Sequence, residues 1–147
     1  MENKKIELLE FVAFANVIRR ESEKYCHHDC TKEISVPNAK FLAYLYQHQN
    51  EDVHQKDLEE AFSVRPSTVS RSLKLLEEQG YVIRTASVYD SRLKKITLTE
   101  KSLKIVDSFE NVLGNVFGKM TKGIPQEELD GFFETLEKMK RNLLGEQ

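Results

Sequence analysis

The stretch that decides the fold spans residues 63–99 and reads SVRPSTVSRSLKLLEEQGYVIRTASVYDSRLKKITLT. A proline suits the first turn of a helix and a glycine the residue that ends one, so this stretch predicts a helix over residues 66–79 that Gly80 terminates. Residues 81–84 and 94–98 have the composition of strands, and the segment between them can form a hairpin loop. Because two strands alone are barely stable, we expect this hairpin to pack against the helices.

The predicted helix over residues 66–79 has two unlike faces. At the α-helical repeat of about 3.6 residues per turn, Val69, Leu73 and Leu76 fall on one side. The opposite side carries short hydroxyl and long cationic side chains, namely Ser67, Ser70, Arg71 and Lys74, flanked by Thr68 and Leu75. Such a face can approach a polyanion closely.

Helices are also predicted before this stretch. Residues 6–25 carry apolar side chains over more than half of a helix's circumference, which predicts a helix that is buried on two sides or faces another subunit. A second helix should begin near Ser35. A third should be capped by Asp52 or His54 and should bury Leu58, Ala61 and Phe62.

Two further helices are predicted after the hairpin. Thr99 should cap a long helix, and Gly123 should end it. Pro125 should open the last helix. The expected order is therefore four helices, two strands and two helices in a single domain.

The charges of the chain are unevenly distributed. The net charge is −2, yet residues 65–95 hold seven basic and three acidic side chains, a net of +4 that leaves −6 for the remainder. A basic segment inside an acidic protein is the pattern expected when one face meets phosphate and the rest must stay away from it.

The composition also bears on location. No apolar run approaches the ~20 residues that a membrane span needs, and the N-terminal residues lack the apolar region of a signal peptide. We therefore expect a cytoplasmic protein with no membrane partner. The two cysteines, Cys26 and Cys30, are too few for a disulfide framework and suit a reducing compartment.

A helix, a tight turn, a second helix and a hairpin with a charged tip describe a winged helix-turn-helix. Over nearly its whole length the sequence resembles the multiple-antibiotic-resistance regulator (MarR) family. The most specific likeness is at residues 90–99, where DSRLKKITLT follows the family's wing pattern of Asp-x-Arg-x-Lys leading into Leu-Thr. Residues 65–73, with their continuation over 76–82, resemble the recognition helix and its exit, and residues 38–45 resemble the family's second helix.

The resemblance implies a mainly α fold with a small β-hairpin wing, flanked by N- and C-terminal dimerisation helices. Residues 1–147 would form one MarR-type domain, in which residues 35–98 are the DNA-binding lobe and residues 1–34 and 99–147 serve mainly dimerisation. We expect a transcriptional regulator, a repressor, that binds a palindromic operator as a homodimer. A small-molecule or redox/metal signal would release or modulate it, and no cofactor is required.

We predict that the helix contacts double-stranded DNA through Arg65, Ser67, Thr68, Ser70, Arg71 and Lys74. Residues near the start of a recognition helix reach base edges, so Ser67, Thr68 and Arg71 are assigned to bases, with Arg71 able to pair bidentately with guanine. Ser70 and Lys74 are assigned to phosphates that set the register. Arg65 adds a positive charge beside the helix.

The wing should add a minor-groove contact through Arg92, because a narrow groove concentrates negative potential. Lys94 and Lys95 are also candidates, but neighbouring residues of a strand alternate sides, so only one of them should face phosphate. By family resemblance, Asp90 anchors the wing and orients the nearby arginine.

Two groups are candidates for the signal. Cys26, His27, His28 and Cys30 form one dense reactive cluster, which suggests a thiol or metal sensor; the alternative is that the cysteines pack and the histidines are solvated. Tyr25, Phe41 and Tyr44 could line an effector pocket, although aromatic residues at helical spacing also form cores. No metal site is assigned.

Two other classes of function compete with DNA binding as interpretations of this sequence. An enzyme is disfavoured because the sequence has no Gly-rich phosphate loop, nucleophile elbow or metalloprotease motif. A winged-helix module that binds protein without reading DNA remains the alternative. The basic wing favours DNA over that alternative, and the dependence of binding on salt distinguishes the two.

Overall fold

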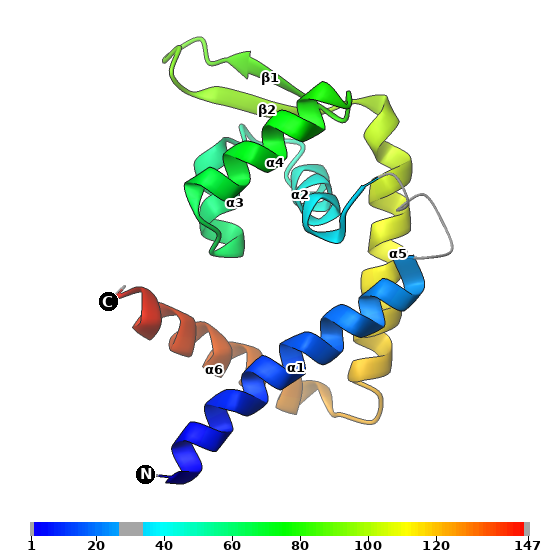
Figure 1. Cartoon of the computed structure of the whole chain (residues 1–147), viewed down its shortest axis with the longest axis vertical. Helices are drawn as coiled ribbons and strands as arrows, with labels where there is room; N and C mark the ends of the chain where they lie inside the picture. The colour runs from blue at the N-terminus through cyan, green and yellow to red at the C-terminus, as the bar shows by residue number, and fades with distance from the viewer. Residues whose placement is uncertain (1, 27–33, 146–147) are drawn as a thin grey trace. The chain divides into compact units, whose positions relative to one another are not determined.

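The computed structural model describes residues 2–26 and 34–145 (Figure 1). The described residues form, in order, α1 (Glu2–Cys26), α2 (Val36–Gln47), α3 (Gln55–Phe62), α4 (Pro66–Glu78), β1 (Val82–Ala86), β2 (Lys94–Leu98), the 3₁₀ helix η1 (Glu100–Ser102), α5 (Leu103–Met120) and α6 (Gln126–Leu144). The predicted mainly helical fold with a small antiparallel hairpin is confirmed. None of the described helices is long and apolar enough to cross a membrane.

The chain divides into two compact units, Met1–Leu113 and Gly114–Gln147, with the boundary inside α5. The first unit contains the winged-helix lobe, by which we mean α2, α3, α4 and the β1–β2 hairpin. The predicted division into a DNA-binding lobe and dimerisation segments is a functional one and stays a prediction.

The lobe is built around the buried face of α4. Val69, Leu73 and Leu76 have no exposed surface, and Leu58 of α3 is equally buried beside them in the same hydrophobic core. Helix α4 contacts both α3 and β1. The periodicity of the sequence therefore predicted this face of α4 correctly.

The β1–β2 hairpin makes backbone hydrogen bonds both between its strands and to the loop before α3. Its pairing runs from Val82 opposite Leu98 to Ala86 opposite Lys94. The Ile96 amide also donates a hydrogen bond of 2.9 Å to the carbonyl of Val53, in the loop before α3. The hairpin is thereby tied to the helices by its backbone as well as by its side chains.

The turn between α3 and α4 fixes where α4 begins. Ser63 adopts the left-handed conformation, with φ of 50°. The carbonyl of Arg65 accepts the amides of Thr68 and Val69 at 3.0 and 3.2 Å, which closes the first turn of α4. Gln55 of α3 donates a side-chain hydrogen bond of 3.3 Å to the Pro66 carbonyl.

Several predicted boundaries and burials are wrong. The first strand starts at Val82 and runs to Ala86, not over residues 81–84. Thr99 precedes the 3₁₀ helix η1 and does not cap α5, since its hydroxyl donates to the Gly80 carbonyl at 2.6 Å. In α3, Ala61 is exposed and not buried, because Leu58 and the half-buried Phe62 already occupy the face turned to the core.

The apolar face of α1 is not covered within the chain. Among the α1 side chains that the structure describes, the single buried one is Ser22. The exposed large apolar residues of α1 include Leu8, Leu9, Phe11, Val12, Phe14 and Val17. Burial of this helix on two sides by its own chain is therefore wrong, and a second subunit remains the predicted partner.

The different faces of α4 yield a stability prediction. Leu73→Ala should lower the free energy of unfolding by about 2–5 kcal/mol, because it opens a cavity in a packed core. Leu75→Ala removes the same atoms from a side chain that is 42% exposed and should cost much less. Urea unfolding followed by circular dichroism measures both. Equal losses in the two variants would contradict the assigned orientation of α4.

Candidate nucleic-acid interface

The outward face of α4 is polar along its length. Ser67, Thr68, Ser70, Arg71 and Lys74 are all exposed, on the side away from the buried leucines. Arg65, at the N-cap position, is also exposed and makes no capping hydrogen bond through its side chain. The structure thus brings the six predicted helix residues onto one accessible surface.

The cations of this surface are largely uncompensated. Lys74 lies 4.0 Å from Glu78, and both side chains are mostly exposed, so water screens the pair strongly. In the described part of the chain, no ion pair is recorded for the guanidinium groups of Arg65, Arg71 or Arg92. These charges are available to a polyanion.

Arg84 has a different role, although its charge contributes to the basic segment. Its Nε donates to the Glu77 carboxylate at 2.9 Å, which joins β1 to the last turn of α4. This hydrogen bond holds the pKa of the Glu77 carboxyl below its usual value. Arg84 therefore holds the hairpin against the helix, a pairing that the sequence did not predict.

Backbone hydrogen bonds close the wing. The Ser87 amide donates to the Leu93 carbonyl at 2.7 Å, and the Leu93 amide donates to the Asp90 carbonyl at 3.0 Å. The Asp90 carboxylate accepts the Arg92 amide at 2.9 Å. Asp90 thus contacts the backbone of Arg92, and the guanidinium of Arg92 stays exposed. The role of Asp90 as the wing anchor remains a prediction.

Lys94 and Lys95 lie in different surroundings. The Lys95 ammonium lies 2.6 Å from the Asp52 carboxylate, and that hydrogen bond lowers the pKa of Asp52. The Asp52 carboxylate is therefore paired with a lysine of β2 and does not cap α3. The N-cap of α3 is His54, whose backbone amide donates a hydrogen bond of 2.7 Å to the Asp57 carboxylate. Lys94 is exposed, with no ion pair recorded among the described residues. Of the two lysines, Lys94 is the one left for phosphate.

Residues 34–93 match the model of the MarR family. This stretch, 60 of the chain's 147 residues, is similar to the MarR family. The match covers α2, α3, α4, β1 and most of the wing loop.

Solved structures that resemble the chain span almost its whole length. The transcription regulator MarR from Oenococcus oeni PSU-1 is 26% identical, with a TM-score of 0.73 over 92% of this chain and 98% of that one. S. aureus MepR, in a DNA complex, is 24% identical, with a TM-score of 0.79 over 90% and 93%. The heme sensor protein PefR from Streptococcus agalactiae, in complex with heme, is 24% identical, with a TM-score of 0.60 over 92% and 92%. The likeness to MepR and PefR bears on the fold alone.

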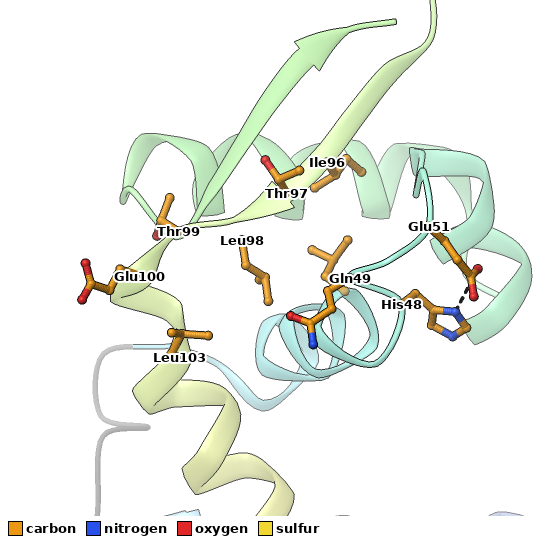
Figure 2. A pocket seen from close by; sticks show the side chains of 10 residues that line it. His48, Gln49, Glu51, Ile96, Thr97, Leu98, Thr99, Glu100 and Leu103 are labelled. Carbon is orange, nitrogen blue, oxygen red and sulfur yellow. Dashed lines mark hydrogen bonds and ion pairs between the residues drawn. The ribbon is translucent and has the colours of Figure 1, made fainter.

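Two cavities lie in the first unit of the chain. One, of about 250 Å³, lies between the end of α2 and the segment from β2 to α5. His48 and Glu51 lie at its side (Figure 2). The distance from His48 Nδ1 to Glu51 Oε2 is 3.2 Å. The other, of about 310 Å³, lies beside the wing, where Arg92 and Lys94 contribute to its lining.

The predicted effector residues line neither of these two cavities, and their role stays a prediction. Phe41 is 1% exposed and packs edge-on against Phe62 in the hydrophobic core, with ring centroids 5.3 Å apart. Tyr44 stacks on His48, with centroids 4.2 Å apart. Tyr25 is 37% exposed on α1. None of the three lines either cavity described above.

The predicted sensor cluster falls largely outside the described residues. His27, His28 and Cys30 lie in the segment 27–33, and Cys26 ends α1 with its side chain outside the description as well. Among the described residues, no group of three histidine, cysteine or acidic side chains could hold a metal ion. The sensor hypothesis stays a prediction.

The Glu77–Arg84 pair predicts a pH effect on stability. Because folding lowers the pKa of Glu77, its ionised form stabilises the fold above the ordinary carboxyl pKa, and that contribution disappears as the pH falls through the lowered value. Glu77→Gln should therefore lose less stability than the wild type on acidification from pH 6 to about pH 3.

Thermal unfolding at several pH values tests this expectation. Glu78→Gln is the matched control, since the ion pair of Glu78 with Lys74 is 4.0 Å long and both side chains are mostly exposed. The control should follow the wild type. If Glu77→Gln also followed the wild type, the ion pair would have no part in fixing the hairpin.

Proposed function

We propose that the chain is a DNA-binding transcriptional regulator that binds a palindromic operator as a homodimer and represses until a signal releases it. One observation carries the proposal. Helix α4 buries Val69, Leu73 and Leu76 completely and presents hydroxyl and largely uncompensated cationic side chains on the opposite face, in the same lobe as a basic wing. This surface suits the phosphates and base edges of a duplex.

Helix α4 would enter the major groove through its N-terminal half. Ser67 and Thr68 are short, so the backbone of the helix can come close to the bases. Arg71, one turn further along, has the reach and the donor geometry for a guanine edge. Ser70 and Lys74 would hold phosphates on either side.

The wing would reach the neighbouring minor groove. Arg92 is exposed in a loop that four backbone and side-chain hydrogen bonds hold in place. A guanidinium held in this way loses little conformational freedom when it enters a narrow groove. Lys94 would meet phosphate beside it.

The dimer hypothesis rests on apolar surface that the single chain leaves open. No described residue of α6 is buried. Its exposed large apolar side chains are Phe132, Phe133, Leu136, Met139, Leu143 and Leu144. A patch of this kind on a monomer marks an interaction surface. A second copy of the chain offers the same surface in return, as two-fold symmetry requires.

The signal would be a small molecule or a redox or metal change. A similar protein, PefR, is named as a heme sensor, which supports a ligand-responsive member of the family without identifying this chain's ligand. The reactive cluster of Cys26 to Cys30 remains the candidate for a thiol or metal signal.

Substitution of Arg71 and substitution of Arg92 should weaken DNA binding in different ways. Arg71→Ala should cost ~1–3 kcal/mol on the operator and relax discrimination at one base position in each half-site. Arg92→Ala should lower the slope of log affinity against log salt by about one charge per subunit. Fluorescence anisotropy with operator and scrambled duplexes measures both effects.

Arg20→Ala serves as the control for these two variants, because Arg20 is an exposed arginine on α1 and outside the proposed surface. It should bind like the wild type. If Arg71→Ala and Arg92→Ala also bound like the wild type on a verified operator, DNA recognition by α4 and the wing would be refuted. Salt-independent capture of a protein would then favour an interaction module.

The dimer should dissociate when charge enters the apolar face of α6. The wild type should have an apparent mass in solution of about twice its chain mass of 17.1 kDa. Phe133→Asp together with Leu136→Asp should shift it toward the monomer, because unpaired carboxylates would be buried in the interface. Sedimentation at several concentrations measures the change, with Glu134→Gln as the control. A wild-type chain that is monomeric and well folded at high concentration would contradict the hypothesis.

A further inference from the structure

The tip of the wing carries two apolar side chains with almost no contacts. Val88 is 96% exposed and Tyr89 is 98% exposed, the largest values for any large hydrophobic residue that the structure describes. Single exposed apolar residues are common on protein surfaces. Two consecutive ones at the end of a projecting loop, both almost fully exposed to water, are unusual and indicate a contact surface.

The backbone holds these two residues outward. Strand pairing ends at Ala86 opposite Lys94, so residues 87–93 extend beyond the sheet. The Tyr89 amide donates to the Ser87 hydroxyl at 3.3 Å on one side of the tip. On the other side, Asp90 accepts the amides of Arg92 and Leu93. The hydrogen bonds therefore lie at the base of the tip, and none of them draws either side chain back toward the core.

The tip also has a consistent chemical character. Arg92 supplies a cation three residues after Tyr89, and Lys94 supplies another where the strand begins. A tyrosine combines a rigid apolar ring with a polar end that can donate or accept a hydrogen bond. The apolar residues are thus continuous with the cationic part of the proposed DNA surface.

We propose that Val88 and Tyr89 are DNA-contacting residues, an apolar wedge that packs against the deoxyribose walls of the minor groove beside Arg92. The inference rests on the proposed function. Apolar side chains are used in this way by proteins that bind the minor groove. The Tyr89 hydroxyl meets there the hydrogen-bond acceptors that A·T and T·A pairs share, so the wedge favours A·T-rich flanks without reading their order.

A minor-groove duplex fits this tip better than a protein partner does. A protein site for two exposed apolar residues needs an enclosing apolar pocket, whereas this tip carries the exposed Arg92 and belongs to the same lobe as α4. The cations would steer the wing to phosphate, and the apolar pair would then exclude water from the groove wall.

Salt dependence separates the wedge from the cations. Apolar contacts release no counterions, so Tyr89→Ser should weaken operator binding by about tenfold at every salt concentration and leave the slope of log affinity against log salt unchanged. Tyr89→Phe keeps the ring and should retain most of the affinity, while Val88→Ser should give a smaller parallel loss. The probe is a duplex selected by the wild-type protein from genomic fragments, titrated by fluorescence anisotropy at four salt concentrations.

A change of flanking bases locates the contact. Inosine–cytosine pairs keep the major groove of G·C but lack the guanine amino group in the minor groove. Replacing flanking G·C pairs by inosine–cytosine pairs should strengthen binding of the wild type and strengthen that of Tyr89→Ser clearly less. The control is Tyr46→Ser, on α2, where the tyrosine is 36% exposed and outside the proposed surface. It should behave as the wild type does.

The outcomes are distinguishable. If the wild type binds its duplex with a steep salt dependence and Tyr89→Ser binds equally well, the wedge is refuted while the proposed function stands. If Tyr89→Ser loses affinity but gains as much from inosine as the wild type, Tyr89 contacts DNA outside the minor groove and the proposal is overturned. If the wild type selects no duplex, the proposed function itself fails and the wedge fails with it.

Discussion

Three buried side chains on one face of α4 set the geometry of the lobe. Val69, Leu73 and Leu76 are removed from water completely, and their burial rotates the helix so that its hydroxyl and cationic residues must face outward. The same contacts place the first turn of α4 after the Ser63 turn and bring its last turn against β1. The polar surface is therefore a consequence of core packing, and a loss of the core would remove the surface with it.

Two ion pairs within the lobe determine which of its cationic side chains are available to bind a polyanion. Arg84 is bound to Glu77 between β1 and α4, and Lys95 is bound to Asp52 between β2 and the loop before α3. Both pairs are partly exposed, so each contributes modestly to stability. Their main effect is positional, since they hold the hairpin on the helices and leave Lys94, Arg92 and the α4 cations for a polyanion. The basic segment thus contains both structural and available charges.

Local patterns in the sequence predicted the elements of the winged-helix lobe well. Features that depend on contacts between residues far apart in the sequence could not be predicted. The spacing of apolar residues predicted the buried face of α4, and the composition of residues 94–98 predicted the limits of β2. Both predictions succeeded because helical periodicity and strand composition are properties of residues close together in the sequence. The partners of Lys95 and Arg84 could not be predicted, since each lies on a different element. The helical spacing of Phe41 is compatible with a pocket wall and with a core, and its packing against Phe62 of α3 could not be predicted for the same reason. The apolar side chains of α1 stay exposed in the single chain, and a second copy is their predicted partner.

The most direct measurement compares two adjacent lysines of identical chemistry on one strand. Operator affinity would be titrated against salt for the wild type, Lys94→Ala and Lys95→Ala. Because Lys94 is exposed and Lys95 is held by Asp52, Lys94→Ala should lower the slope of log affinity against log salt by about one charge per subunit, and Lys95→Ala should leave that slope unchanged. A reduced slope for Lys95→Ala with an unchanged slope for Lys94→Ala, or salt-independent binding by the wild type, would contradict the assignment of this surface to DNA.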